Sequence, residues 1–423
     1  MNLKQEALVT LPIHKKCLAI VFVAVSSVVF LSLIHARSLV AQDVQDAQLP
    51  ALAVQKIEFA ADYRATDLIA ADLVSSGWLA LFDGNSKFGW RAESEAIWQI
   101  KDGLIVAEGS QPGLLRTASQ FDCFRFSMQY RCEAGTDASV FFRTSPRPSE
   151  QDAVEVALDA GDGNEFRTLE VEINASEFAV WVDGVETKRI EADQLPVLRG
   201  YIGFQCQQGK VQLKDVWLRP LLNVNAVPAD SEPNAASRMA VPLNWTASTE
   251  NDFVAATNEQ GNVLTLTGGP GYVESDQQFS NFVLQAKCKI SVGGNSGIFY
   301  RCVPGENTLG YESQIDNRVA AETADTPANC GTGGIFRRKD ARQIVAADET
   351  WFAKTIVAEG PHVAVWVNGY QVTDWTDKRK ADRNPRRGLR VSAGTLMLQG
   401  HDAETTTEFR EINVRELLER RSR

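Results

Sequence analysis

The chain has 423 residues, of which 44% are hydrophobic and 23% are charged, a composition typical of globular proteins with enough apolar material for a sizeable core. Its formal net charge is −11, and an acidic chain repels a phosphate backbone, so nucleic acid is excluded as an expected partner. Neutral ligands such as sugars remain compatible with this charge.

The N-terminus has the layout of an export signal. Lys15 and Lys16 precede an uncharged run at residues 17–34, and small residues follow as far as Ala41. This layout predicts a signal peptide over residues 1–41, cleaved after Ser38 or Ala41. The run of 18 residues is also just long enough to span a bilayer, so an uncleaved membrane anchor is the alternative. Either way we expect an exported protein: periplasmic, secreted or anchored to the cell envelope.

The rest of the chain divides by composition. Residues 42–76 are rich in alanine and are expected to be a leader segment. Residues 223–242 are rich in Pro, Ala, Asn and Ser, which predicts a linker between domains at 77–222 and 243–418, with a tail at 419–423. Both domains contain many short alternating runs separated by Asp-Gly or Asn-Gly pairs, the residues of tight hairpin turns. The sequence therefore predicts an all-β protein made of sandwiches or jelly rolls.

Seven cysteines are present, and no two of them form a C-x-x-C pair, which argues against a zinc ribbon or a thioredoxin motif. Each domain contains three, an odd number that argues against a full disulfide framework. A Cys302–Cys330 bridge and buried free thiols are both compatible with the sequence.

The two domains repeat each other. The segment FDCFRFSMQYRCEAGTDASVFFRTSP, at 121–146, aligns without a gap with FSNFVLQAKCKISVGGNSGIFYRCVP, at 279–304, an offset of 158. Later, AVWVDG at 179–184 matches AVWVNG at 364–369, an offset of 185. The second domain therefore carries 27 additional residues, including a Gly-rich segment at 329–334. Long surface loops on a sandwich are places where binding sites are built.

These segments resemble the 3-keto-disaccharide hydrolase family. The motifs that carry the resemblance are LFDG at 81–84, GW at 89–90, NSGIFYR at 295–301, GYESQIDN at 310–317, TGGIF at 332–336, WVNG at 366–369 and LQGHD at 398–402. The GYESQIDN segment is one residue shorter before its Asp than the family's G-x-E-x-Q-x-x-D-N pattern. The resemblance implies two tandem concanavalin-like jelly-roll β-sandwiches, and an activity that cleaves glycosides oxidised at C3 of the sugar.

Candidate site residues lie in the second domain. Glu312, Gln314 and Asp316 alternate along an expected strand, so their side chains are expected on one face. With the resemblance, Glu312, Asp316 and His401 become candidate catalytic residues, since imidazole and carboxyl groups suit acid–base chemistry. A solvent-exposed strand face is the alternative for Glu312, Gln314 and Asp316, and a structural loop residue is the alternative for His401.

Four further residues are expected to bind substrate: Gln314, Arg301, Gln399 and Tyr300. For Arg301 the alternative is an ion pair with a carboxylate such as Glu312, and for Tyr300 it is core packing. A divalent metal ion held by Glu312, Asp316 and His401 would be chemically reasonable, but the sequence leaves the cofactor unknown.

The first domain departs from the pattern. Ala157 stands where the second domain has Gln314, Gln207 stands where it has His401, and the Gly-rich segment is missing. The first domain is therefore expected to be a degenerate copy. The expected function is that of an exported protein that cleaves 3-keto-glycosides by C2 proton abstraction, elimination and hydration. The alternative is a non-catalytic, lectin-like envelope protein that binds carbohydrate.

Overall fold

The computed structural model describes residues 71–418, except 93–97, 110–111, 147–152, 162, 164, 175–176, 192–197, 223–242, 250–251 and 321–325. All of them belong to one compact unit. The expected signal segment, most of the expected leader, the linker and the tail lie outside the described residues. Among the described residues, no helix has the length and apolar character needed to cross a membrane.

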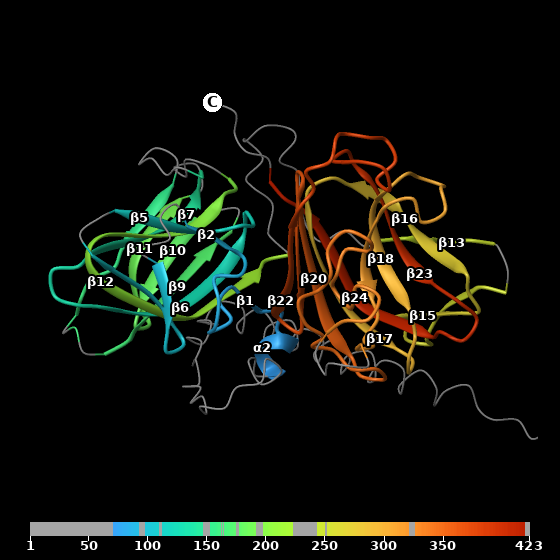
Figure 1. The fold of residues 1–423 in the computed structure, drawn as a ribbon, viewed down its shortest axis with the longest axis horizontal. Helices are drawn as coiled ribbons and strands as arrows, with labels where there is room; N and C mark the ends of the chain where they lie inside the picture. Colours follow the sequence, from blue (N-terminus) through green and yellow to red (C-terminus); the bar gives the residue numbers. More distant parts are fainter. Residues whose placement is uncertain are drawn as a thin grey trace, which may run out of the picture. The chain divides into compact units, whose positions relative to one another are not determined.

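The all-β prediction is confirmed: the described residues form two layered β structures, and α2 is a short helix that precedes the first of them (Figure 1). The first sandwich contains α2 (Ala71–Ser75), β1 (Leu79–Ala80), β2 (Trp90–Ala92), β3 (Trp98–Lys101), β4 (Leu104–Gly109), β5 (Gly113–Thr117), β6 (Phe124–Cys132), β7 (Asp137–Thr144), β8 (Val154–Ala157), β9 (Arg167–Ile173), β10 (Glu177–Val182), β11 (Val185–Glu191) and β12 (Tyr201–Pro220).

One long strand joins the two layers of the first sandwich. The N-terminal half of β12 pairs with β5 and β7, and its C-terminal half pairs with β6, β4 and β1. The sheet that contains the C-terminal half has the order β11-β10-β9-β6-β12-β4-β3. Both layers therefore share a continuous 20-residue strand.

The second sandwich consists of two separate sheets. A five-stranded sheet has the order β13-β16-β23-β18-β19, and a seven-stranded sheet has the order β14-β15-β24-β17-β20-β21-β22. The strands are β13 (Trp245–Ala247), β14 (Val254–Thr257), β15 (Val263–Thr267), β16 (Gly271–Phe279), β17 (Phe282–Ile290), β18 (Ser296–Cys302), β19 (Tyr311–Ile315), β20 (Phe352–Glu359), β21 (His362–Val367), β22 (Tyr370–Thr376), β23 (Gly394–Gly400) and β24 (Thr407–Glu416).

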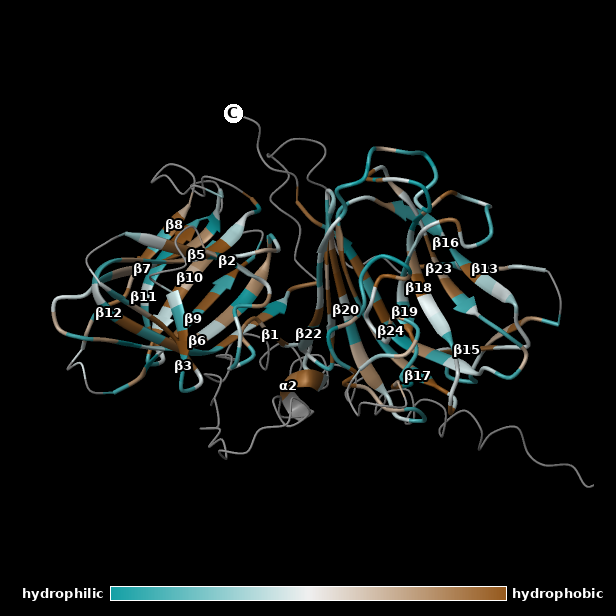
Figure 2. Cartoon of the chain, in the orientation of Figure 1, coloured by the Kyte–Doolittle hydropathy of each residue, from teal (hydrophilic) through white to brown (hydrophobic). Residues whose placement is uncertain are grey.

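Alternating hydropathy and tight turns explain these elements. Along β6 every second residue is buried and the others are partly exposed, the pattern of a strand with one face on the core. Figure 2 shows the same alternation as brown and teal segments along the strands. The Asn-Gly and Asp-Gly turns have positive φ at both positions, as at Asn368 (48°) and Gly369 (73°), which matches the hairpin turn predicted there.

The repeat is visible in the backbone as well as in the sequence. The strands β6 and β7 correspond to β17 and β18, and Arg143 and Arg301 both have positive φ, 55° and 51°. Each of these buried arginines donates from Nε to the carbonyl of the residue 21 positions earlier: Asp122 at 2.8 Å and Ser280 at 2.7 Å. The two sandwiches therefore share an uncommon local conformation that fixes a strand end.

The described cysteines are all free and buried. The Cys302–Cys330 bridge is thus not formed. Of the two arrangements compatible with the sequence, the structure has buried free thiols. Their role in the described residues is that of small apolar side chains in the core.

A buried ion pair links the two sandwiches. Asp122 of the first and Arg415 of β24 are each 1% exposed, and both carboxylate oxygens of Asp122 accept from the guanidinium at 2.6 Å. Burial opposes the ionisation of Asp122, but Arg415 and two backbone N–H donors outweigh it and hold the pKa of the carboxyl at about 2. The pair is a two-pronged, charge-assisted contact.

Candidate functional site

The five-stranded sheet turns one face to the core and the other face away from it. Core-facing residues such as Ile298 and Leu398 pack in the apolar cluster of the second sandwich. In register, Phe299 lies opposite Glu312 and Met397, and Gly297 lies opposite Gln314. Directly opposite residues of an antiparallel pair point to the same side, so these side chains share the outer face. We call this surface the Glu312 face.

Glu312 occupies a space left open by a glycine. A Cβ added at Gly297 would lie 2.6 Å from Oε1 of Glu312 and 2.8 Å from its Cγ. The carboxyl group is therefore laid over β18, where it is partly buried. Burial raises the pKa of Glu312 to about 7, although the positive charges of Lys354, Arg386 and Arg337 act to lower it. Such a carboxyl group exchanges protons near neutral pH.

Gln314 orients this carboxyl group. In the amide orientation that gives both ends a suitable partner, its Nε2 donates to Oε1 of Glu312 at 2.9 Å and to the carbonyl of Ser296 at 3.1 Å, while its Oε1 accepts from Asn329 Nδ2 at 2.9 Å. Gln314 is itself 1% exposed. The alternation of Glu312 and Gln314 thus places them on one face, as the sequence predicts.

A buried lysine holds the same strand from the core side. Lys354 of β20 is fully buried, and its Nζ donates to the carbonyls of Ser313 and Gln314, each at 2.7 Å. Burial lowers the pKa of Lys354 to about 8, opposed by the nearby Cys288, Glu312 and Cys330. Lys354 therefore anchors β19 directly behind the Glu312 face and contributes positive charge near the carboxyl group.

The centre of the face is apolar and its far side carries an amide. Phe299 and Met397 form a small buried cluster against which Tyr272 packs. Gln399 lies opposite Tyr272 in the register of β16 and β23, and both are partly buried. The Oε1 atom of Gln399 is buried without a hydrogen-bond partner, which leaves an acceptor for a donor such as a hydroxyl group.

Asp316 lies beyond the end of β19 and serves the neighbouring loop. Its carboxylate accepts from Arg318 Nε at 2.8 Å and Nη2 at 2.6 Å, and from Asn329 Nδ2 at 3.2 Å. Its backbone N–H donates to Thr332 Oγ1 at 2.8 Å. Asp316 is 0% exposed, so its carboxylate supports the Gly-rich segment 329–334, and it shares the Asn329 amide donor with Gln314.

His401 directly follows β23, the strand that carries Gln399. Its side chain is 42% exposed, and Nδ1 lies 2.8 Å from Oδ2 of the adjacent Asp402. The imidazole is therefore a solvent-accessible group at the end of the strand, oriented by its neighbour.

Tyr300 and Arg301 lie away from the face. The register of β18 and β23 shifts between Phe299 and Cys302, and Tyr300 stacks on Tyr311 in the core with ring centroids 5.5 Å apart. Arg301 is 1% exposed and donates to the carbonyls of Ser280, Gly360 and Arg390. The structure thus gives Arg301 carbonyl partners, and not the carboxylate partner considered from the sequence.

Glu312, Asp316 and His401 do not form a metal-ligand cluster. Within the described ranges, no three His, Cys, Asp or Glu side chains lie close enough together to hold an ion. The carboxylate of Asp316 is instead occupied by Arg318. These three residues therefore do not fit the divalent-ion site considered from the sequence.

The equivalent position in the first sandwich is built differently. Ser139 stands where the second sandwich has Gly297, and its Oγ donates to Oε1 of Glu155 at 2.6 Å. Glu155 is exposed, and its neighbour two residues on is Ala157. The first sandwich thus has the carboxylate without the pocket left by a glycine or the orienting amide.

Comparison with known proteins supports the sequence resemblance. The family model described as a 3-keto-alpha-glucoside-1,2-lyase-like domain matches residues 77–164 and 242–415, more than half of the chain. No curated protein matches the sequence. Among solved structures, one of a candidate glycosyl hydrolase from Parabacteroides distasonis is 22% identical, covering 41% of this chain and 100% of its own, with a TM-score of 0.33. The carbohydrate-binding module CBM66 from Bacillus subtilis is 14% identical, covering 41% of this chain and 95% of its own, with a TM-score of 0.30.

Proposed function

Because the chain belongs to the 3-keto-alpha-glucoside-1,2-lyase-like family, we propose that its second sandwich cleaves glycosides oxidised at C3 of the sugar. The observation that carries the proposal is the partly buried carboxyl group of Glu312 on the outer face of the sheet, with its pKa raised by burial to about 7. An acid–base group works best when its pKa is close to the working pH.

The reaction begins with the proton on C2, which the neighbouring ketone acidifies. The Glu312 carboxylate takes that proton, the C2–H electrons form the C1–C2 double bond, and the C1–O bond breaks. The departing oxygen takes a proton and leaves as an alcohol, so the first products are an enone and the free aglycone. Water then adds across the double bond, with hydroxyl to C1 and hydrogen to C2, which completes a net hydrolysis.

Neighbouring groups supply orientation and hydrogen bonds. Gln314 fixes the carboxyl group through its 2.9 Å contact, and the buried Oε1 of Gln399 would accept from a sugar hydroxyl. We propose His401, an exposed imidazole at the end of the same strand as Gln399, as the donor to the departing oxygen. An imidazole can act in this way near neutral pH.

Carbohydrate binding without catalysis is the second candidate function. The partly buried Tyr272 beside Gln399 on a sheet face would contact a sugar ring through its aromatic surface. This contact needs no ionisable carboxyl group. It would therefore support sugar binding even if Glu312 does not abstract a proton.

The test is incubation of the full chain with a 3-keto-disaccharide in deuterated water, with and without chelator. Cleavage is followed by release of the aglycone, and proton abstraction by deuterium incorporation at C2. The enzymatic proposal expects both. Binding of the sugar with neither release nor exchange would contradict it and favour the lectin-like function.

We also propose that the protein is exported. The support is the Lys15-Lys16 pair followed by the uncharged run at 17–34, the layout of a signal peptide or anchor. Fractionation of cells that express the full chain, with N-terminal sequencing of the mature protein, tests this. Recovery of the intact chain in the cytosolic fraction would contradict it.

A further inference from the structure

Two basic segments lie beside the strand that carries Glu312. Residues 378–390 contain seven Lys or Arg residues and one Asp. Residues 337–342 contain four Lys or Arg residues and one Asp. This concentration is unusual in a chain whose net charge is −11. Because these basic residues lie beside β19, their charge affects which ligands the Glu312 face can bind.

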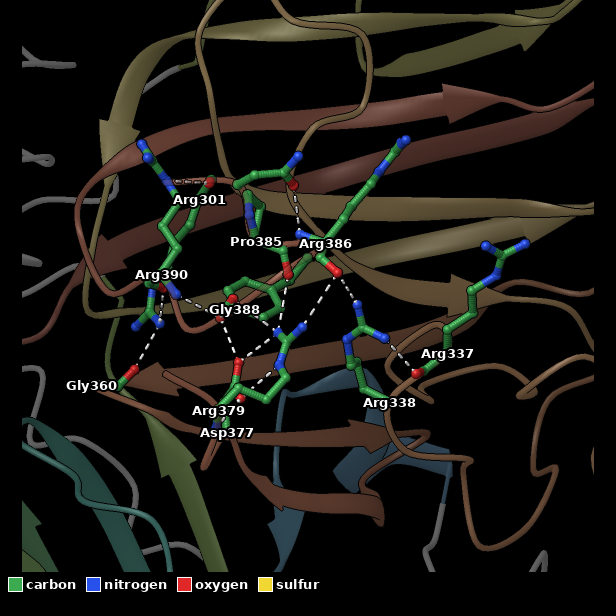
Figure 3. A network of polar contacts seen from close by, with 12 residues as sticks. Arg301, Arg337, Arg338, Gly360, Asp377, Arg379, Pro385, Arg386, Gly388 and Arg390 are labelled. Carbon is green, nitrogen blue, oxygen red and sulfur yellow. Dashed lines mark hydrogen bonds and ion pairs between the residues drawn. The ribbon is translucent and has the colours of Figure 1, made fainter. Parts of the chain in front are cut away.

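Internal contacts fix these segments to each other and to β19. Arg379 forms a two-pronged ion pair with the buried Asp377, at 2.9 Å and 2.7 Å, and Asp377 also accepts from Tyr311 Oη at 2.8 Å. Arg338 donates from Nη2 to the carbonyl of Arg386 at 2.6 Å. Figure 3 shows this network. Two of the arginines are thus structural, and they hold the remaining ones in place.

Arg337 and Arg386 present their charge outward. In Figure 3 their side chains extend away from the network, toward the same side of the view. The Arg386 guanidinium donates to the backbone and hydroxyl oxygens of Thr308, at 3.0 Å and 3.1 Å, and Arg337 lies over the ring of Phe336, 5.1 Å from its centroid. Both are exposed, and within the described residues neither has an ion pair with a carboxylate.

One backbone and two side-chain hydrogen bonds place the two residues close to the strand that carries Glu312. The N–H of Phe336, next to Arg337, donates to the carbonyl of Glu312 at 3.0 Å. Thr308, the partner of Arg386, precedes β19 by three residues. The two guanidinium groups also act on the Glu312 carboxyl group through their charge. Both arginines are therefore held beside β19, the strand that carries Glu312.

We propose that Arg337 and Arg386 bind a carboxylate or sulfate group of an acidic saccharide that lies across the Glu312 face. This inference rests on the proposed function for the location of the sugar. A guanidinium group that pairs with no carboxylate among the described residues suits the two oxygens of a carboxylate or sulfate, whereas a neutral sugar does not require one. The acidic body of the protein disfavours extended polyanions such as nucleic acids, so a saccharide with local negative charge is the better fit.

Calorimetric titration of the full chain tests the proposal with defined probes. Oligogalacturonate supplies carboxylates, sulfated dextran oligosaccharide supplies sulfates, and unsulfated dextran and galacto-oligosaccharides of the same length are their neutral counterparts. We expect at least one acidic probe to bind more tightly than its neutral counterpart at low salt. The expected gain in affinity is about tenfold for each arginine that contacts the anionic group. The paired substitution Arg337→Gln and Arg386→Gln should remove that difference.

A control pair changes the charge equally elsewhere: Lys101→Gln with Arg189→Gln, both in the first sandwich. The control should keep the preference for the acidic probe. Equal affinity for acidic and neutral probes, failure of both acidic probes to bind, or equal loss in the control pair would overturn the proposal. Binding of single-stranded DNA with the same affinity and the same arginine dependence would also overturn it, as it would indicate general attraction of polyanions.

The result is separable from the proposed reaction. Binding is measured without turnover, and Glu312→Gln should leave the preference for the acidic probe in place. Cleavage of a neutral 3-keto-disaccharide with no acidic preference would defeat only this inference. An acidic preference without C2 exchange would defeat only the proposed reaction.

Discussion

The two sandwiches have the same framework but treat one carboxylate differently. In the first, Ser139 binds an exposed Glu155, whereas in the second Gly297 lets Glu312 lie over the sheet, where it is partly buried. A second difference lies beneath: Leu169 of the first, fully buried, stands where the second has Lys354. Two small changes on either side of a strand therefore distinguish an ordinary surface glutamate from a candidate acid–base group.

The largest expected effect comes from removing the carboxyl group itself. We expect Glu312→Gln to slow C2 exchange by about a hundredfold to ten-thousandfold, the usual contribution of a positioned acid–base group. The matched substitution Glu155→Gln should leave the rate unchanged. Equal rates for wild type and Glu312→Gln would retire Glu312 as the base.

The same substitution has a predicted effect on stability. The pKa of Glu312 is raised, so the folded state holds the proton more tightly, and stability falls as pH rises from about 4.5 through about 7. Glu312→Gln should therefore be as stable as wild type at pH 4 and more stable at pH 8, as measured by thermal unfolding. If the unfolding temperatures of the two proteins differ by the same amount at pH 4 and at pH 8, the raised pKa of Glu312 is contradicted.

The junction between the sandwiches offers a second way to break the comparison. Asp122→Ser introduces the residue that the second sandwich has at the equivalent position, Ser280, and leaves Arg415 buried without an anion. We expect a loss of about 3–5 kcal/mol in the free energy of unfolding, measured with urea. Since the folded pKa of Asp122 is lowered to about 2, this contribution is complete above about pH 4 and is lost as pH falls through about 2.

An exposed aspartate provides the control for that experiment. Asp159, with a side chain 65% exposed, pairs with Arg167, and Asp159→Ser should cost less than about 1 kcal/mol. A comparable loss in both variants would mean that burial is not what makes the Asp122 pair important.

Exchanging the glycine gives a smaller and more specific effect. Gly297→Ser copies the first sandwich and places a Cβ against Cγ, Cδ and Oε1 of Glu312, so the whole glutamate side chain must move aside. We expect the carboxyl group to become more exposed, its pKa to fall below about 7, and the pH profile of C2 exchange to move to lower pH. Ala247→Ser, at an exposed position of β13 in the same sheet, is the control; a profile that stays in place in Gly297→Ser would contradict the role of the glycine.

The smallest expected change in the pH profile of C2 exchange comes from substituting Lys354, which lies behind β19. Lys354→Leu copies Leu169 and removes the positive charge that lowers the pKa of Glu312, so the pH profile should move to higher pH. In wild type the pKa of Lys354 is lowered to about 8, so stability should rise as pH increases from about 8 to about 10.5, and the variant should lack this rise. A profile that does not move would limit Lys354 to a structural role.

Much of this architecture could be predicted from the sequence. The offsets of 158 and 185 locate the repeat, the Asp-Gly and Asn-Gly pairs locate the hairpins, and the alternation of Glu312 and Gln314 places both on one face. These features are local, since each depends on residues a few positions apart and on the regular period of a strand.

The remaining features depend on contacts that the sequence pattern does not record. Tyr300 faces the core by simple alternation, two residues after the core-facing Ile298. The irregular register at Arg301, with its positive φ, turns Arg301 away from the face, which alternation does not show. Lys354 resembles any lysine of a half-exposed strand, and its burial depends on carbonyls 40 and 41 residues earlier. Gly297 is recognisable as part of a site only once Glu312 is seen to occupy its space.

The long strand β12 of the first sandwich has no continuous counterpart in the second. There the corresponding path is divided into β23, which ends at Gly400, and β24, which begins at Thr407, and His401 stands at the break. A shared strand couples two layers mechanically, so that neither can shift without the other. In the second sandwich no single strand ties the two layers together at this point, and the exposed imidazole of His401 stands at the break, where a departing alcohol would meet the proposed proton donor at the solvent edge of the sheet.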